Sequence, residues 1–418
     1  MGHVMNPTPR RGVIAVAALL AFAAVTSCAP ASAAGPARAD GPARTTSPNP
    51  ARPASAGQAS LRSGTPYLPK PTGSQPVGTT SLYLKDTSRA DPWVPSVKAR
   101  ELMVSLWYPA KSRGRKPAPY MTPKESELLM KEGEITDLPL DLLSKTRTNA
   151  TTDAEPAGRR RGLPLVVLST GFTEPRSSLT ALAEDLASRG YAVVSIGHTY
   201  ETATSFPGGR ITTCVACEVK EKNQTFWDKV GATRAADVSF VLDALTRAHP
   251  QWKSAALIDP SRIAMAGHSA GGASAVAAML KDPRVRAGID IDGTAFVPVP
   301  KSGLSRPFLF LGTQAKHSPG GKDVSWDGVW QNLTGWKRWL VVAGAEHVSF
   351  TDIAVLGAQI GIYRNADLPP ARSMGITRTY VAAFFDLHLR TKPQPLFDER
   401  SPRFPEVKLC EVEQKACA

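Results

Sequence analysis

The feature that most constrains the fold is residues 263–280, where a strand, a sharp turn and a helix follow one another. Ile263 to Ala266 is an apolar run typical of a buried strand, and Gly271 to Leu280 is a helical stretch of mostly small residues. Gly267-His268-Ser269-Ala270-Gly271 joins them and matches the pattern G-x-S-x-G, with Gly272 next. The glycines are needed because side chains two residues from the serine would collide in so tight a turn.

The rest of the chain alternates between strand and helix in the same way. The predicted strands are Ser81 to Leu84, Arg100 to Tyr108, Leu165 to Leu168, Tyr191 to Ile196, Ile263 to Ala266, Val285 to Ile291, Phe308 to Leu311 and Trp339 to Val342. The predicted helices are Leu179 to Ser188, Ala232 to Thr246, Gly271 to Leu280 and Thr377 to Leu389. This spacing predicts one α/β domain, residues 77–418, with a doubly wound, mostly parallel sheet and helices on both faces.

The stretch from Pro119 to Arg161 interrupts the alternation. It contains a short predicted helix near Lys124 to Lys131 and a polar tail. We interpret it either as a cap over a cleft or as a surface excursion without a role in substrate access.

The first 28 residues have the pattern of an export signal. Arg10 and Arg11 precede the apolar run Val13 to Val25, which is short for a permanent membrane span. Val25-Thr26-Ser27-Cys28 resembles the bacterial lipobox, so we predict a lipoprotein signal with Cys28 as the acylated residue. The alternative is cleavage after Ala31-Ser32-Ala33 and free secretion.

Residues 29–76 are dominated by Ala, Pro, Gly, Ser and Thr, which predicts a disordered tether. The formal net charge of the chain is +14, and the tether and signal contribute a basic excess that suits an anionic envelope. The sequence contains no nucleic-acid-binding motif, and no obligate protein partner is evident.

Five cysteines are present, and four remain if Cys28 carries lipid. An even number in an oxidising compartment indicates two disulfides, and we favour Cys214 with Cys217 and Cys410 with Cys417. Zinc on the C-x-x-C pair is the alternative.

Ser269 is the candidate nucleophile, and it needs a base because a serine hydroxyl attacks poorly at neutral pH. A serine in this kind of turn is followed along the chain by the acid and then by the histidine. His198 precedes the serine and is therefore disfavoured, whereas His347 comes directly after the last predicted strand. We predict His347 as the base and keep His317 as the alternative.

The acid must lie between the serine and the histidine and follow a strand. Asp290 and Asp292 both lie at the end of Val285 to Ile291, and we expect only one of them to reach the site. Asp292 lies just past the strand and is the predicted acid, while Asp290 is predicted to be structural. The loop after the next strand, residues 312–317, holds no carboxylate, which strengthens Asp292.

Attack on an ester creates an oxyanion, which two fixed N–H groups must stabilise. The backbone N–H of Ala270 is the first predicted donor. The second is expected from Ser169-Thr170-Gly171-Phe172, and we nominate the N–H of Phe172. A plain strand-to-helix turn is the alternative interpretation of this segment.

These residues resemble the platelet-activating-factor acetylhydrolase family, meaning the plasma-type, calcium-independent lipoprotein-associated phospholipase A2 and its bacterial relatives. The similarity covers roughly Ser81 to Arg390, and its motifs are D-x-x-R-x-D-P-W at Asp86 to Trp93, Trp107-Tyr108-Pro109, Ser-x-Gly-Phe at Ser169 to Phe172, G-H-S-x-G-G, I-D-G and G-x-x-H-x-x-F. The resemblance implies the α/β-hydrolase fold, a triad on Ser269, Asp292 and His347, and Phe172 as an oxyanion donor. Thr170 stands where relatives commonly carry histidine, which questions substrate fit more than catalysis.

The predicted function is hydrolysis of short-chain carboxylic esters through an acyl-Ser269 intermediate, with no cofactor and no metal. The resemblance implies phospholipid-like esters with short or oxidised acyl chains, including sn-2 acetyl groups. The alternatives are a polyester or cutin-type hydrolase with the same triad and a binding lipoprotein without activity. The expected partners are a small-molecule or lipid ester and, if Cys28 is acylated, the membrane; the expected location is outside the cytoplasm, as a cell-envelope lipoprotein or a secreted protein.

Overall fold

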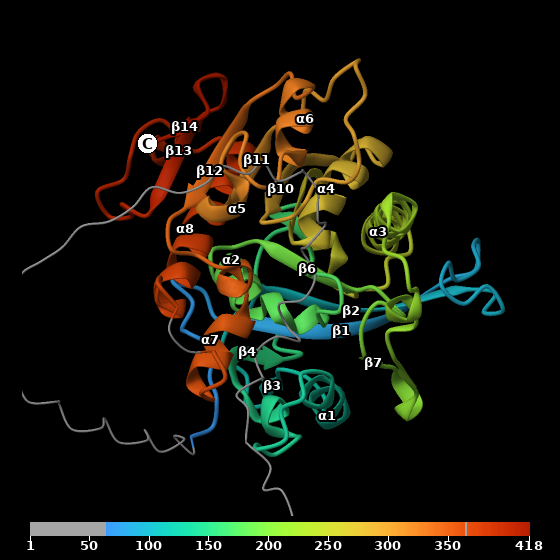
Figure 1. Cartoon of the computed structure of the whole chain (residues 1–418). Helices are drawn as coiled ribbons and strands as arrows, with labels where there is room; N and C mark the ends of the chain where they lie inside the picture. The colour runs from blue at the N-terminus through green and yellow to red at the C-terminus, as the bar shows by residue number, and fades with distance from the viewer. Residues whose placement is uncertain (1–63, 364–365) are drawn as a thin grey trace, which may run out of the picture.

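A twelve-stranded sheet runs through the molecule, which the computed structural model describes over residues 64–363 and 366–418 (Figure 1). The strand order is β14-β13-β12-β11-β10-β9-β5-β6-β2-β1-β4-β3, and β7 and β8 form a separate pair. The strands are β1 (Val77–Asp86), β2 (Arg100–Pro109), β3 (Pro117–Pro119), β4 (Arg147–Thr152), β5 (Leu163–Ser169), β6 (Ala192–Gly197), β7 (Thr204–Ser205), β8 (Ile211–Thr212), β9 (Ile258–His268), β10 (Val285–Ile291), β11 (Phe308–Thr313), β12 (Lys337–Val342), β13 (Val407–Glu411) and β14 (Ala416–Cys417).

The six central strands, from β6 to β12 in the sheet order, are mutually parallel. At the flanks, β2 pairs antiparallel with β6 and β1, and β13 pairs antiparallel with β12. The whole of β5 is buried, which explains its unbroken apolar sequence, because a parallel strand has helices on both faces. The predicted doubly wound, mostly parallel sheet is therefore confirmed.

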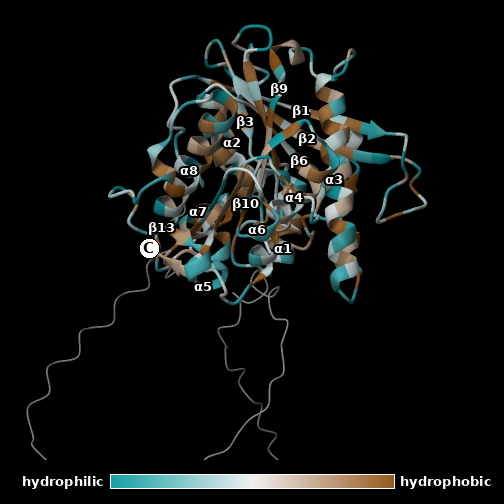
Figure 2. Ribbon diagram, turned by 90° about the horizontal axis from the view of Figure 1, so that it is seen from above, coloured by the Kyte–Doolittle hydropathy of each residue, from teal (hydrophilic) through white to brown (hydrophobic). Residues whose placement is uncertain are grey.

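Helices cover both faces of this sheet. They are α1 (Pro123–Glu132), α2 (Thr180–Ser188), α3 (Gln224–Thr246), α4 (Ala270–Lys281), α5 (Gln314–His317), α6 (Ser325–Gln331), α7 (Asp352–Gln359) and α8 (Pro370–Arg390). Helices α2 and α8 pack on one face, and α3, α4 and α6 pack on the other. Figure 2 shows the apolar residues gathered between these layers.

Helix α3 begins eight residues before the predicted Ala232, at Gln224. Its N-cap is Asn223, whose side chain accepts the backbone N–H of Phe226. Gly231 interrupts the helical pattern of the sequence, which is why the first two turns escaped prediction.

The folded part begins earlier than the predicted residue 77. Leu68 is buried, and Arg378 on α8 donates hydrogen bonds to the carbonyls of Pro69 and Lys70. Leu68 also belongs to an apolar cluster, so residues within the segment that we assigned to the tether contact the folded domain through both polar and apolar groups. The predicted signal peptide, Cys28 and the tether up to residue 63 lie outside the described residues. Within the described ranges, no helix combines the length and the apolar character needed to cross a membrane.

The stretch from Pro119 to Arg161 is integrated into the fold. It contains α1, as predicted, and also β4, which pairs with β1 and extends the sheet. The sequence RTNATT of β4 lacks an apolar run, so this strand was not predicted. The carboxylate of Glu125 on α1 bonds to Arg176 and to the backbone of Ser205.

Two disulfides are present, Cys214–Cys217 and Cys410–Cys417. These are the pairs that we favoured from the sequence. The second bridge joins directly opposite positions of β13 and β14. In this structure the C-x-x-C pair is a disulfide and not a pair of zinc ligands.

Candidate active site

Ser269 lies at the turn between β9 and α4. Its backbone has φ 55° and ψ −124°, a strained conformation for a non-glycine residue. A Cβ atom on Gly271 would lie 2.0 Å from the backbone oxygen of Ser169, and one on Gly267 would lie 2.2 Å from the backbone of Gly271. The glycines of the motif therefore permit the close approach of β5, β9 and α4 that exposes the serine.

The side chains of Asp292 and His347 are in contact at the carboxyl ends of β10 and β12. Asp292 Oδ2 lies 2.6 Å from His347 Nδ1, and Asp292 Oδ1 accepts the backbone N–H of Thr313 at 2.6 Å. Burial alone would raise the pKa of Asp292, but the bond to His347 and nearby positive charge hold that pKa well below its usual range. The buried carboxylate is therefore ionised, while 39 % of the His347 side chain remains exposed.

The loop that carries His347 is tied to the serine turn. His268 Nε2 lies 2.8 Å from the backbone oxygen of His347, and the two ring centroids are 4.5 Å apart. Across the described residues, the Ser269 hydroxyl makes no hydrogen bond to the His347 ring. Hydrogen bonds of this kind commonly tighten only in the complex with substrate.

Asp290 is the last residue but one of β10 and lies two positions before Asp292. It is fully buried and accepts the backbone N–H of Gly293 at 2.9 Å, and it does not contact His347. Burial raises its pKa well above the usual value, which favours the neutral carboxyl group. Of the two carboxylates at this strand end, the structure brings only Asp292 to the histidine.

His317, the alternative base, contacts the acid instead of the serine. Its Nε2 lies 3.6 Å from Asp292 Oδ1, and its ring stacks on Trp326 with centroids 4.1 Å apart. The ring is fully buried, and burial lowers its pKa to about 4. His317 is therefore a neutral neighbour of the carboxylate.

The two nominated oxyanion donors lie on adjacent segments. Ala270 is the first residue of α4, and the N–H groups at a helix start have no partner within the helix. Within the part of the chain that the structure describes, no protein acceptor contacts the N–H of Ala270 or of Phe172. Both groups are therefore free to bind an oxyanion.

A second hydrogen-bonded serine, histidine and aspartate lie behind this turn, and sequence analysis missed them. Ser169 Oγ lies 2.9 Å from His198 Nε2, and His198 Nδ1 lies 2.9 Å from Asp237 Oδ2. Arg100 bonds to both oxygens of Asp237, and Arg234 donates to Ser169 Oγ at 3.2 Å. No residue of this network is more than 3 % exposed, so a substrate cannot reach it. The signal in the sequence was an arginine and an aspartate three residues apart on the apolar face of a long helix.

Aromatic side chains surround the two donors. The ring of Phe172 packs edge-on against Phe226 and Trp227, with centroids 5.5 and 5.7 Å away. Trp227 in turn stacks on Phe296 at 5.6 Å, and Ala270 belongs to the same cluster. The site therefore has apolar, aromatic walls.

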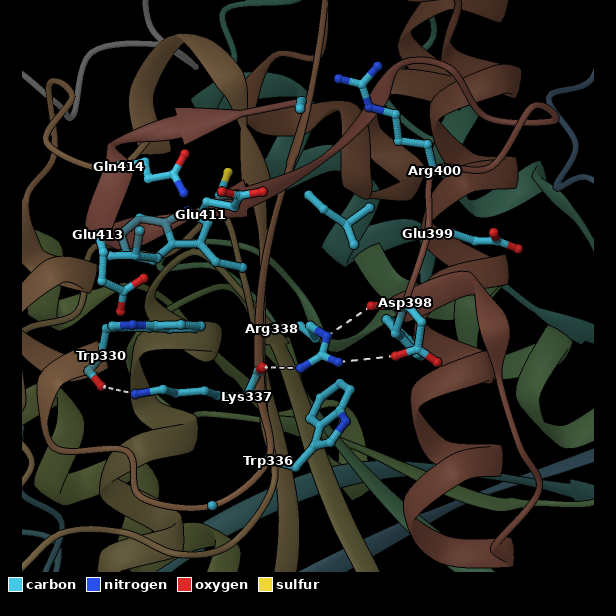
Figure 3. A pocket seen from close by; sticks show the side chains of 17 residues that line it. Trp330, Trp336, Lys337, Arg338, Asp398, Glu399, Arg400, Glu411, Glu413 and Gln414 are labelled. Atoms are coloured by element: carbon cyan, nitrogen blue, oxygen red, sulfur yellow. Dashed lines mark hydrogen bonds and ion pairs between the residues drawn. The ribbon is translucent and has the colours of Figure 1, made fainter.

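A separate hollow lies away from these residues (Figure 3). It is lined by residues at the start of β12 and by the C-terminal segment. Two of its cations have partners: Arg338 bonds to Asp398, and Lys337 donates to the carbonyl of Trp330. Ligands in open α/β sheets bind at the carboxyl ends of the strands. The hollow is therefore not the candidate active site.

Comparisons with known proteins agree with this geometry. The family model described as "Platelet-activating factor acetylhydrolase, isoform II" matches residues 61–230 and 250–394. A probable 1-alkyl-2-acetylglycerophosphocholine esterase of Arthroderma benhamiae is 28% identical in a match that covers 81% of this chain and 92% of that protein. The platelet-activating factor acetylhydrolase of Gallus gallus is 26% identical in a match that covers 55% of this chain and 63% of that protein.

A solved structure is also similar, that of the ferulic acid esterase from Streptomyces cinnamoneus. It is 42% identical with a TM-score of 0.74, and the match covers 83% of this chain and 99% of that one. The family model covers well over half of the chain, and these relatives are all named as esterases or acetylhydrolases. The chain therefore belongs to the platelet-activating factor acetylhydrolase, isoform II, family and is a carboxylic ester hydrolase with the α/β-hydrolase fold.

Proposed function

We propose that Ser269 is the nucleophile of this hydrolase, His347 its general base and Asp292 the carboxylate that orients the ring. The observation that carries this proposal is the 2.6 Å contact between Asp292 and His347 Nδ1, in a loop tied to the serine turn. A carboxylate on Nδ1–H leaves Nε2 without a proton, ready to accept the one from the serine.

The reaction has two halves. The Ser269 oxygen attacks the carbonyl carbon of the ester while His347 takes the hydroxyl proton, and the N–H groups of Phe172 and Ala270 stabilise the oxyanion. The C–O bond then breaks, the imidazolium gives its proton to the leaving alcohol, and acyl-Ser269 remains. Water attacks this acyl group with the same histidine as base, which releases the carboxylic acid and restores the serine.

The test is a Ser269→Ala variant. We expect it to lose hydrolysis of p-nitrophenyl butyrate and labelling by a fluorophosphonate probe, while its far-UV circular dichroism and melting temperature stay close to wild type. Retention of either the turnover or the label would contradict the assignment.

The first candidate substrate is a short-chain acyl ester of the phospholipid type, including sn-2 acetyl groups, as in the named activity of the fungal and avian relatives. The expected measurement is release of acetate from a 2-acetyl glycerophospholipid, compared with esters of graded acyl length. A polyester or cutin-type activity would instead appear as turnover of an insoluble polymer.

A second candidate is an ester of an aromatic acid, which the aromatic walls formed by Phe172, Trp227 and Phe296 favour. The 42% identical Streptomyces protein is named as a ferulic acid esterase. We expect Trp227→Ala to lower kcat/KM for methyl ferulate more than for p-nitrophenyl acetate, because a flat acyl group stacks on indole. Trp330→Ala, in the hollow of Figure 3, is the matched control and should leave the ratio of the two values unchanged. An equal loss on both substrates in Trp227→Ala would contradict this candidate.

We further propose that the enzyme is exported and that Cys28 carries a lipid anchor. The two disulfides support an oxidising compartment. Palmitate labelling of wild type and of Cys28→Ala in a bacterial host is the test. We expect label and membrane association only in wild type; unlabelled wild type in the medium would favour the alternative of free secretion.

A further inference from the structure

Two charged side chains hold the oxyanion turn, which we define as Ser169 to Glu174. Arg234, on α3 and 1 % exposed, donates to the carbonyl of Thr170 at 2.5 Å and to that of Gly171 at 3.4 Å. The carboxylate of Glu174 accepts the backbone N–H of Gly171 at 3.1 Å. Hydrogen bonds therefore hold the turn from two sides, from Arg234 in the protein interior and from Glu174 at the C-terminal end of the turn.

These hydrogen bonds determine the direction of the Phe172 N–H. In a trans peptide the carbonyl and the N–H point in opposite directions. The carbonyl of Gly171 faces Arg234 and also accepts the backbone N–H of Glu174 at 3.2 Å. The N–H of the same peptide belongs to Phe172, so it points away from the arginine and is left for the substrate.

Each of the two charged groups has a charged partner of its own. Arg234 forms an ion pair with Glu201 at 2.8 Å, and both side chains are almost completely buried. Glu174 Oε1 lies 3.0 Å from His268 Nδ1, an ion-pair contact rather than a well-aligned hydrogen bond. His268 Nε2 also contacts the backbone oxygen of His347, so the pair links the oxyanion turn to the loop of the base.

The pKa shifts of both members of the second pair favour their charged forms. Burial opposes ionisation of Glu174, but the positive His268 ring lowers the pKa of the carboxyl group to about 2. The pKa of His268 is raised in return, because the Glu174 charge outweighs the burial of the ring. The 3.0 Å contact and these pKa directions together favour an ion pair at the C-terminal end of the turn.

We propose that Arg234 and Glu174 are positioning residues that align the Phe172 N–H with the developing oxyanion. The inference rests on the proposed function of Ser269 and Phe172. In this proposal the two ionic side chains assist acyl transfer through the Phe172 N–H, without contacting the substrate themselves. Because the alignment counts only when the oxyanion forms, it affects the transition state and not the bound ester.

The test uses Glu174→Gln and Arg234→Lys with matched controls. Glu184→Gln alters another buried carboxylate that accepts backbone N–H groups, those of Asn149 and Ala150. Arg378→Lys alters another buried arginine that donates to backbone carbonyls, away from the turn. These controls separate a loss of general stability from a loss of alignment.

Loss of one oxyanion donor lowers kcat about 10²- to 10³-fold, so a misdirected donor should lower it about 10- to 100-fold in both test variants. KM should stay near the wild-type value. The affinity for a trifluoromethyl ketone, which forms a tetrahedral oxyanion on the serine, should fall in the same ratio as kcat/KM. The two controls should keep wild-type kcat and inhibitor affinity.

Wild-type kcat and inhibitor affinity in Glu174→Gln would overturn the inference, and so would an equal loss of kcat in the controls. If Arg234→Lys does not fold, Glu174→Gln decides. The proposed function is tested separately, with Ser269→Ala. A wild type that is inactive and unlabelled would contradict both the proposed function and this inference. An active wild type with an inactive Ser269→Ala variant supports the proposed function, whatever the result for Glu174→Gln.

Discussion

Replacing Asp292 by Asn tests the proposed triad most sharply, because the structure determines how the new side chain must sit. The backbone N–H of Thr313 needs an acceptor at Oδ1, 2.6 Å away. An asparagine has one acceptor oxygen and one NH₂ group, so its oxygen meets Thr313 and its NH₂ faces His347. The NH₂ then donates to Nδ1, and the ring proton must sit on Nε2, where the proton of Ser269 should go.

The expected loss follows from this tautomer. In triads of this type the aspartate-to-asparagine change lowers kcat about 10⁴-fold, and at 1.36 kcal/mol per tenfold this is about 5 kcal/mol of barrier. We expect a loss of this order in kcat for p-nitrophenyl butyrate, with an unchanged melting temperature. The fold should survive because Asn has nearly the same shape as Asp.

The matched control is Asp290→Asn at the same strand end. Asp290 is equally buried, but its carboxyl group accepts the N–H of Gly293, and burial raises its pKa well above the usual value, which favours the neutral form. An amide is neutral as well, so we expect kcat close to wild type. The proposed role of Asp292 would be refuted if the Asp292→Asn variant kept more than about a tenth of wild-type kcat. It would also be refuted if both variants lost kcat equally.

Three further predictions concern stability. Gly271→Ala should unfold or displace the serine turn, because its Cβ would lie 2.0 Å from a backbone oxygen. The control is Gly375→Ala on α8, where a Cβ meets nothing within 4 Å and should stabilise the fold by about 0.5 to 1 kcal/mol. Thermal melts and kcat compare the two variants. The pKa of Glu174 lies at about 2 instead of its ordinary 4.5, so its ionisation stabilises the fold above pH 4.5 and that stability is lost as the pH falls towards 2. The melting temperature of Glu174→Gln should therefore depend less on pH over this range, and parallel acid curves would contradict the idea. Replacing both cysteines of Cys410–Cys417 by Ser should cost about 2 kcal/mol, since the bridge closes a short loop with a separation of 7 residues; urea unfolding measures it, and an unchanged midpoint would argue against it.

Much of the fold could be predicted because its signals are local. The apolar runs of β5 and of the second half of β9 are continuous, since central parallel strands are buried on both faces. The serine turn can be predicted from the sequence because only glycine tolerates the close backbone contacts around Ser269. Strand β4 and the packed residues 64–76 were not predictable, because contacts with distant segments hold them.

The same division applies to the candidate site. The sequence alone determined which serine sits in a strained strand-to-helix turn. It also determined which late histidine and aspartate follow strands, because the order and spacing of residues along the chain can be read directly from the sequence. Only the tertiary structure decided that Asp292 and not Asp290 meets His347. It also decided that His268 pairs with Glu174 and that Arg234 reaches the carbonyls of the oxyanion turn. These contacts join residues up to 94 positions apart, and burial makes each charge costly unless the fold delivers its partner.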